Sequence, residues 1–141
     1  MLAYVFWHRP AEDVDREDYE TRLRAFHQTV DASSACFAVD RLPWKDLDGY
    51  EDWYLVEHWA ALGVLNATAV NAEHDAAAAG SAAGWGGVYA LVRGAAEVPA
   101  GGRWSHDDDV SAETSWRRQL VLGPAPQFCV SGQPEGRRRV F

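Results

Sequence analysis

The fold is decided by residues 51–65, EDWYLVEHWAALGVL, where a strand pattern changes directly into a helix pattern. Residues 51–58 are rich in aromatic and β-branched side chains, which favour a strand. From Trp59 onward, aliphatic residues and alanines recur every three or four positions, as on one face of a helix. An alanine-rich run then leads to Gly80, and glycine commonly ends a helix. We therefore expect a strand followed at once by a helix over residues 59–79.

Three more strands and one more helix can be placed on either side of this stretch. Residues 2–8, 35–42 and 85–93 have the aromatic and β-branched composition of strands. The helix lies between the first two strands and begins near Asp15, an N-cap residue followed by further acids. Its apolar residues are spaced by four, three and four positions, at Tyr19, Leu23, Phe26 and Val30. The order is therefore strand, helix, strand, strand, helix, strand.

This order predicts an α+β fold, a ferredoxin-like βαββαβ unit with two helices against one antiparallel sheet. We expect residues 1–94 to form this domain. Residues 95–141 differ in character: they are loop-like up to residue 114 and then apolar over residues 116–130. We expect this C-terminal extension to supply a loop and one or two short strands, on the sheet edge or across to a partner.

Composition excludes some classes of partner. Acidic residues outnumber basic ones 21 to 13 and the net charge is −8, so phosphate-rich nucleic acids and anionic membranes are poor partners. No window approaches the roughly 18 apolar residues of a membrane helix, and the start does not resemble a signal peptide. Cys36 and Cys129 lie far apart in apolar runs, which indicates reduced, buried thiols. We expect a cytoplasmic protein.

Side-chain alternation divides each predicted strand into two faces. One face is mostly small or β-branched and suits packing against helices. The other is aromatic with polar ends, too apolar to face water, and we expect the same face of a second subunit to cover it in a homodimer. We assign to this aromatic face Tyr4, Phe6, His8, Phe37, Val39, Arg41, Trp53, Leu55, Glu57, Trp59, Tyr89, Leu91 and Arg93.

Residues 57–65, a strand end with the pattern Glu-x-Trp followed by a helix with leucines three apart, resemble a known group of proteins. The pattern is similar to the dimeric α/β-barrel superfamily, which includes antibiotic-biosynthesis-monooxygenase-like, EthD-like and stress-responsive A/B-barrel proteins. The resemblance covers residues 1–94 and implies a homodimeric barrel with a pocket in each protomer. Its members include cofactor-independent oxygenases, isomerases, haem-binding enzymes and proteins without known activity. The extension after residue 94 departs from the pattern, as does the lack of a full catalytic signature.

Two residues are candidates for acid/base chemistry. Glu57, at a strand end beside Trp53 and Trp59, could be a general base with a pKa raised by burial, or a salt-bridge or cap residue. His8 could transfer protons or contact a ligand, or be a solvated strand end. Two further residues, Arg41 and Arg93, could hold a carboxylate or phosphate, or could pair with nearby acids. With the aromatic residues expected to line the cavity, they are the predicted substrate-binding residues: Tyr4, Phe6, Phe37, Trp53, Trp59, Tyr89, Arg41 and Arg93.

We expect no cofactor and no metal site, because no His-x-x-x-His or Cys-x-x-Cys spacing is present. His27 is expected to be a histidine at the edge of the core. Three functions remain open. The first is a cofactor-independent monooxygenase-like or isomerase-like enzyme acting on a small apolar or aromatic molecule. The second is a binding or structural homodimer, and the third is a haem-binding protein with His74 as ligand.

Overall fold

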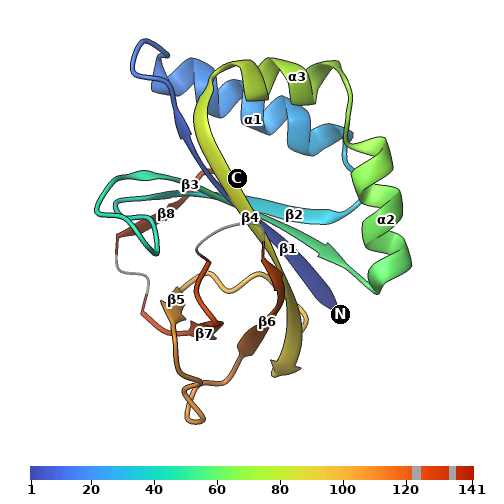
Figure 1. Ribbon diagram of the computed structural model, residues 1–141, viewed down its shortest axis with the longest axis vertical. Coiled ribbons are helices and arrows are strands. Elements are labelled where there is room, and N and C mark those ends of the chain that lie inside the picture. Colours follow the sequence, from blue (N-terminus) through green and yellow to red (C-terminus); the bar gives the residue numbers. More distant parts are fainter. Residues whose placement is uncertain (122–124, 134–135) are drawn as a thin grey trace.

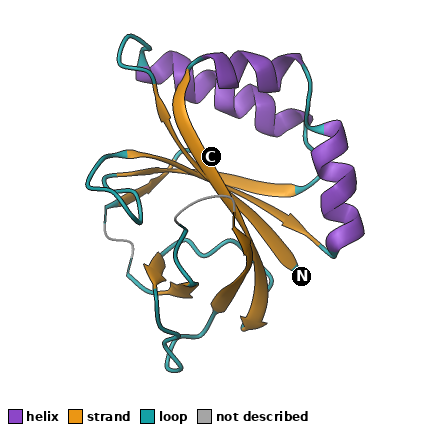
Figure 2. Cartoon of the chain, in the orientation of Figure 1, coloured by secondary structure: helices purple, strands orange, loops and turns teal. Residues whose placement is uncertain are grey.

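The computed structural model describes residues 1–121, 125–133 and 136–141, and these residues form eight strands and three helices. All three helices lie on one side of a single curved sheet (Figure 1). The other side is covered by strands and loops (Figure 2). In chain order the elements are β1 (Leu2–Pro10), α1 (Arg16–Thr29), β2 (Ser33–Val39), β3 (Gly49–Val56), α2 (Trp59–Thr68), α3 (Ala72–Ala79), β4 (Ser81–Arg93), β5 (Gly102–Ser105), β6 (Ser115–Val121), β7 (Phe128–Ser131) and β8 (Arg137–Arg139).

The prediction of a ferredoxin-like βαββαβ fold in a dimeric barrel is wrong. The antiparallel sheet has eight strands in the order β5-β7-β6-β4-β1-β3-β2-β8 and is curled into a half-barrel. The difference comes from the C-terminal extension, which pairs β6 with β4 at one edge and β8 with β2 at the other. Both edges of the first four strands are therefore paired within the chain, and the twist of a long sheet curls it on itself.

Side-chain caps explain where the helices begin. The Asp15 carboxylate accepts hydrogen bonds from the backbone N–H groups of residues 17 and 18, so α1 begins where the sequence predicted. The single helix expected over residues 59–79 is instead two helices. The side chain of Asn71 accepts hydrogen bonds from the N–H groups of residues 73 and 74, which starts α3 after a break.

The helix-side face of the sheet carries Tyr4, Phe6 and His8 of β1. The register pairs Tyr4 with Tyr54 of β3 and with Val88 of β4, so these side chains share one face. The sequence analysis assigned this β1 set to the opposite face, beside Trp53 and Tyr89, and this assignment is wrong. The prediction aligned β1 with β3 and β4 one residue out of register. Because side chains alternate along a strand, an error of one residue exchanges its two faces.

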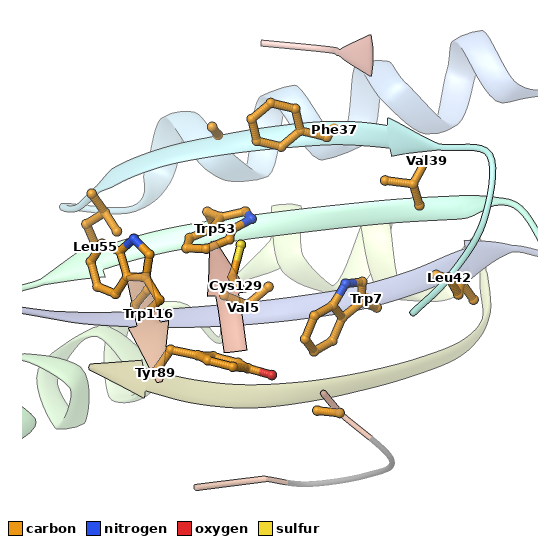
Figure 3. Packing of buried hydrophobic residues seen from close by; sticks show 13 residues of the cluster. Val5, Trp7, Phe37, Val39, Leu42, Trp53, Leu55, Tyr89, Trp116 and Cys129 are labelled. Carbon is orange, nitrogen blue, oxygen red and sulfur yellow. The ribbon is translucent and has the colours of Figure 1, made fainter. Parts of the chain in front are cut away.

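The barrel-side face is the other face of the sheet, and its buried residues form a continuous core (Figure 3). The labelled side chains of this core are Val5, Trp7, Phe37, Val39, Leu42, Trp53, Leu55, Tyr89, Trp116 and Cys129. Trp116 and Cys129 come from β6 and β7, so the extension itself covers the aromatic face. Phe37 is 1% exposed and Tyr89 0% exposed in a single chain, which removes the reason for expecting a second subunit as the cover.

Glu51 is the buried polar centre of the barrel-side core. Its Oε1 accepts hydrogen bonds from Trp53 Nε1 at 2.6 Å and from Arg137 Nη2 at 2.6 Å. Its Oε2 accepts from Trp7 Nε1 at 3.1 Å and from Trp104 Nε1 at 2.6 Å. Each carboxylate oxygen thus has two donors, and the Arg137 guanidinium neutralises the charge while lying over the Phe37 ring.

Two further expectations can be compared with the structure. Both cysteines are free and buried, as predicted, and burial raises the pKa of each thiol, so neither is a ready nucleophile. Among the described residues, no helix has the length and apolar character needed to cross a membrane.

Candidate functional site

A cavity of about 570 Å³ lies between the helices and the helix-side face of the sheet. Its walls are mainly apolar side chains of all three helices, including Leu23, Leu62 and Leu65. The helix α2 has few contacts with the core, because Leu65 is its only buried residue. Apolar residues surround the cavity at exposed positions, among them Trp59 at 52% exposure and Val70 at 70%. A space of this size with apolar walls is typical of sites for small molecules.

The polar part of the cavity is centred on His8 of β1. Its Nε2 lies 3.0 Å from Asp52 Oδ2, and its Nδ1 lies 2.6 Å from the hydroxyl of Tyr19. The Tyr19 hydroxyl in turn lies 2.6 Å from Ser81 Oγ. All four residues line the cavity, and they come from β1, β3, α1 and β4. They form a continuous chain of hydrogen bonds from a buried carboxylate to a hydroxyl group.

A second histidine, His27 of α1, contacts the same carboxylate but does not line the cavity. Its Nε2 lies 2.9 Å from the Tyr54 hydroxyl and 3.4 Å from Asp52 Oδ1. Within the part of the chain that the structure describes, His27 Nδ1 and Asp52 Oδ1 have no hydrogen-bond partner. The Asp52 carboxylate is therefore in contact with one histidine through each of its oxygens.

The electrostatics of this cluster favour an ionised carboxylate among neutral phenols. Burial alone would raise the pKa of the Asp52 carboxyl, but His8 and His27 outweigh it and hold that pKa well below its usual range. Burial raises the pKa of the Tyr19 and Tyr54 hydroxyls, and the nearby Asp52 charge adds to this effect. At neutral pH both tyrosines therefore keep their protons and can donate them.

The arrangement can carry one proton along a defined path. If His8 donates its Nε2 proton to Asp52, its Nδ1 can accept from Tyr19, and Ser81 can then donate to the Tyr19 oxygen. If His8 is protonated at both nitrogens, the Tyr19 hydroxyl becomes free to donate to another acceptor. The carboxylate fixes the ring of His8 in either state, as in other His–carboxylate pairs.

The structure brings together four of the predicted site residues and separates the rest. Tyr4, Phe6, His8 and Trp59 line the cavity. His8, one of the two predicted catalytic residues, is buried and not a solvated strand end. Glu57, the other one, is exposed between β3 and α2 and does not line the cavity.

The remaining predicted ligand-binding residues lie elsewhere. Phe37, Trp53 and Tyr89 are buried in the barrel-side core, away from the cavity. Arg41 is 70% exposed and pairs with Asp46, close to the strand end. Arg93 is held by the Asp108 carboxylate and by the backbone oxygens of residues 109 and 112. Neither arginine can reach a ligand in the helix-side cavity, because neither is among its lining residues.

His74 lies at the edge of the cavity and not within its polar part. Its Nδ1 is 3.2 Å from the Asp75 carboxylate, and its ring contacts the ring of Phe26. In the described ranges, no group of three or more His, Cys, Asp or Glu side chains is arranged to hold a metal ion. Haem binding through His74 stays a prediction.

Sequence reasoning missed the importance of Asp52, Tyr19 and Ser81. Asp52 has the same strand parity as Tyr54, which packs on the helix side of the sheet. The sequence therefore puts a charged residue on the face that packs against helices. A buried acid needs a partner, and this requirement could have pointed to a polar cluster. Tyr19 belongs to the apolar stripe of α1, and only its hydroxyl gives it a polar role. Ser81 follows the helix stop Gly80, and nothing local marks it.

Comparison with known proteins found no relative of this chain. No protein-family model, no curated protein and no solved structure matched the chain. The function therefore has to be argued from the cavity and its residues.

Proposed function

We propose that this chain binds a small, mainly apolar molecule in the helix-side cavity and holds a polar group of that molecule near Ser81 and Tyr19. The main support for this proposal is the combination of a cavity of about 570 Å³, apolar walls and one buried polar cluster. Ligand sites commonly have this composition, in which apolar walls supply affinity and a few polar groups set orientation.

The energetics of Asp52 support a functional role for the cluster. An ionised carboxylate in the protein interior loses its hydration, and well-packed apolar residues are often as stable or more stable in the same place. Buried titratable groups with strongly shifted pKa values beside a cavity are typical of binding and active sites.

A second function, proton transfer to the bound molecule, is favoured by the chain Ser81–Tyr19–His8–Asp52. The Tyr19 hydroxyl would give its proton to an oxygen atom of the ligand and take the proton of His8 Nδ1 in return. Asp52 stabilises the His8 ring throughout. In the enolisation of a ketone, a solvent water molecule would take the proton from the carbon next to the carbonyl while Tyr19 protonates the carbonyl oxygen. The electron pair of the broken C–H bond then forms the C=C bond of the enol, so this isomerase-like step needs no oxidant.

The binding proposal can be tested by titration with 2-tetralone, a small bicyclic ketone. Trp59 is the one tryptophan that lines the cavity, so binding should change its fluorescence, and W59F should lose most of that change. Calorimetry should still detect binding to W59F. Ala69→Phe places a ring inside the cavity and should abolish binding, whereas Ala67→Phe, on the exposed side of α2, should not.

Proton transfer has a separate readout. Wild-type protein in D₂O should accelerate deuterium exchange at the carbon next to the tetralone carbonyl, as followed by NMR. Y19F removes only the hydroxyl, so it should still bind tetralone through the apolar walls, more weakly than wild type, and should lose the acceleration even at saturating tetralone. Binding without any acceleration in wild-type protein would leave the binding function and refute the catalytic one. Equal binding by the Ala69→Phe and Ala67→Phe variants would refute the site itself.

A further inference from the structure

Two glycines of β4, Gly84 and Gly86, lie under aromatic rings that project from β1. A Cβ atom added to Gly84 would lie 2.3 Å from Phe6 Cζ, and one added to Gly86 would lie 2.6 Å from the Tyr4 hydroxyl oxygen. Real Cβ atoms do not approach other atoms so closely. The rings of Phe6 and Tyr4 therefore lean across β4 and occupy the space that side chains at these positions would take.

The leaning rings belong to a row of nearly parallel aromatic planes on the sheet side of the cavity. The centroids of Tyr4 and Phe6 are 6.3 Å apart with 25° between their planes. Phe6 and His8 are 5.6 Å apart with 22° between planes, and Tyr4 and Tyr54 are 6.2 Å apart with 28°. All four residues line the cavity.

The opposite wall of the cavity has a different chemistry. Most of its side chains from α2 and α3 are aliphatic, such as Leu62, Leu65 and Ala77, and Trp59 and Phe26 are aromatic members of the helix side. An aromatic molecule gains stacking or edge-to-face contacts from the sheet side, in addition to the contacts that any apolar molecule makes. A saturated molecule with the same skeleton makes only the contacts that any apolar molecule makes.

We infer that the cavity selects molecules with a planar aromatic ring system, and that Gly84 and Gly86 are the residues that determine this specificity. The inference rests on the proposed binding function and names its ligand class. A side chain at either glycine would meet the far end of a ring and not backbone, so the ring can move. We expect the displaced ring to turn away from β4 and toward the cavity that it lines.

The contrast with two other glycines shows that this arrangement is specific. A Cβ atom at Gly49 would lie 2.7 Å from the backbone oxygen of His8, so that glycine is required by the fold. A Cβ atom at Gly63 of α2, which also lines the cavity, would have no atom within 4 Å. Gly63→Ala is therefore a matched control that adds a methyl group to the cavity wall without displacing a ring.

The test compares 2-naphthol with decahydro-2-naphthol, which share a skeleton and a hydroxyl group and differ in planarity. Calorimetry should show wild-type protein binding 2-naphthol roughly three- to tenfold more tightly. Gly84→Ala and Gly86→Ala should lose most of this preference, and Gly63→Ala should keep it. If Gly84→Ala does not fold, Phe6→Leu, which removes one aromatic plane without adding bulk, should also reduce the preference.

The outcomes separate the two proposals. Equal or tighter binding of the saturated alcohol by wild-type protein would overturn the specificity inference and leave the binding function standing. An unchanged preference in Gly84→Ala, Gly86→Ala and Phe6→Leu would overturn the role of these residues. No measurable heat with either alcohol, together with no tetralone binding, would overturn the binding function itself.

Discussion

Glu51 and Asp52 are consecutive residues of β3, and the two buried carboxylates point to opposite faces of the sheet. Glu51 is surrounded by three indole N–H groups and an arginine, so both of its oxygens are fully hydrogen-bonded. Asp52 is paired with two histidines and a tyrosine, and one of its oxygens has no hydrogen-bond partner among the described residues.

The partners of the two carboxylates differ in what they can do. Indole and guanidinium groups are hydrogen-bond donors only, so the partners of Glu51 have one role, and they lie in a packed core. Histidine gains and loses a proton near neutral pH, and the Asp52 cluster borders a cavity. Glu51 therefore links side chains within the barrel-side core, whereas Asp52 belongs to the proposed binding site.

The largest effect is expected for E51Q. The substitution removes the negative charge that neutralises buried Arg137 and places an NH₂ group among N–H donors. Breaking a buried ion pair in this way costs about 3–5 kcal/mol in the free energy of unfolding. Urea denaturation followed by tryptophan fluorescence measures this loss. E57Q, the same substitution at an exposed glutamate after the end of β3, should leave stability unchanged, and similar losses in both variants would refute the comparison.

A smaller loss, about 1–3 kcal/mol, is expected for D52N, because the amide keeps one oxygen acceptor for the histidines and leaves no guanidinium without its partner. The same variant should weaken tetralone binding or exchange, which E51Q should not affect if it folds. Asp46→Asn, at a highly exposed aspartate, is the matched control. A D52N protein as active and as stable as wild type would mean that the cluster is incidental.

Asp52 also predicts a dependence of stability on pH. Its pKa is lowered in the folded protein, so the unfolded chain binds the proton first as the pH falls. The stabilisation from Asp52 is complete above about pH 5 and decreases progressively at lower pH, because an unfolded aspartate titrates near about 3.9. Unfolding free energies measured between pH 2 and pH 6 should fall more steeply in wild type than in D52N. Parallel curves would contradict the assigned pKa shift.

The smallest effect is expected for R41A. Arg41 was predicted to hold an anionic ligand, but it is mostly exposed and its ion pair with Asp46 is solvated. Such pairs contribute little, so unfolding free energy should change by less than about 0.5 kcal/mol. Calorimetric binding of 2-tetralone should also be unchanged. A clear loss of binding in R41A would place the ligand near Arg41 and not in the helix-side cavity.

Much of the secondary structure could be predicted because its signals are local. The cap at Asp15 and the apolar stripe of α1 lie within a few residues of each other, and the structure confirms that helix. The extension was harder, because β5, β7 and β8 have only four, four and three residues. Strands so short have too few residues for a clear alternation pattern, and only pairing with neighbours stabilises them.

The candidate site could be predicted only in part for the same reason. His8 and the aromatic pair Tyr4 and Phe6 were selected correctly as one face of one strand. Asp52 lies 44 residues away from His8 in the chain, and their contact depends on the register between β1 and β3. Alternation within one strand does not reveal which face of it matches which face of the next.

The sequence by itself determined the local elements, the side chains that share a face within each strand, and the two buried thiols, because each depends on neighbours along the chain or on composition. Only the tertiary structure decided that the extension closes both sheet edges, that the aromatic barrel-side face is covered by its own chain, and that His8, His27 and Asp52 meet beside a cavity. These features depend on strand register and on contacts between distant residues, which no short stretch of sequence specifies.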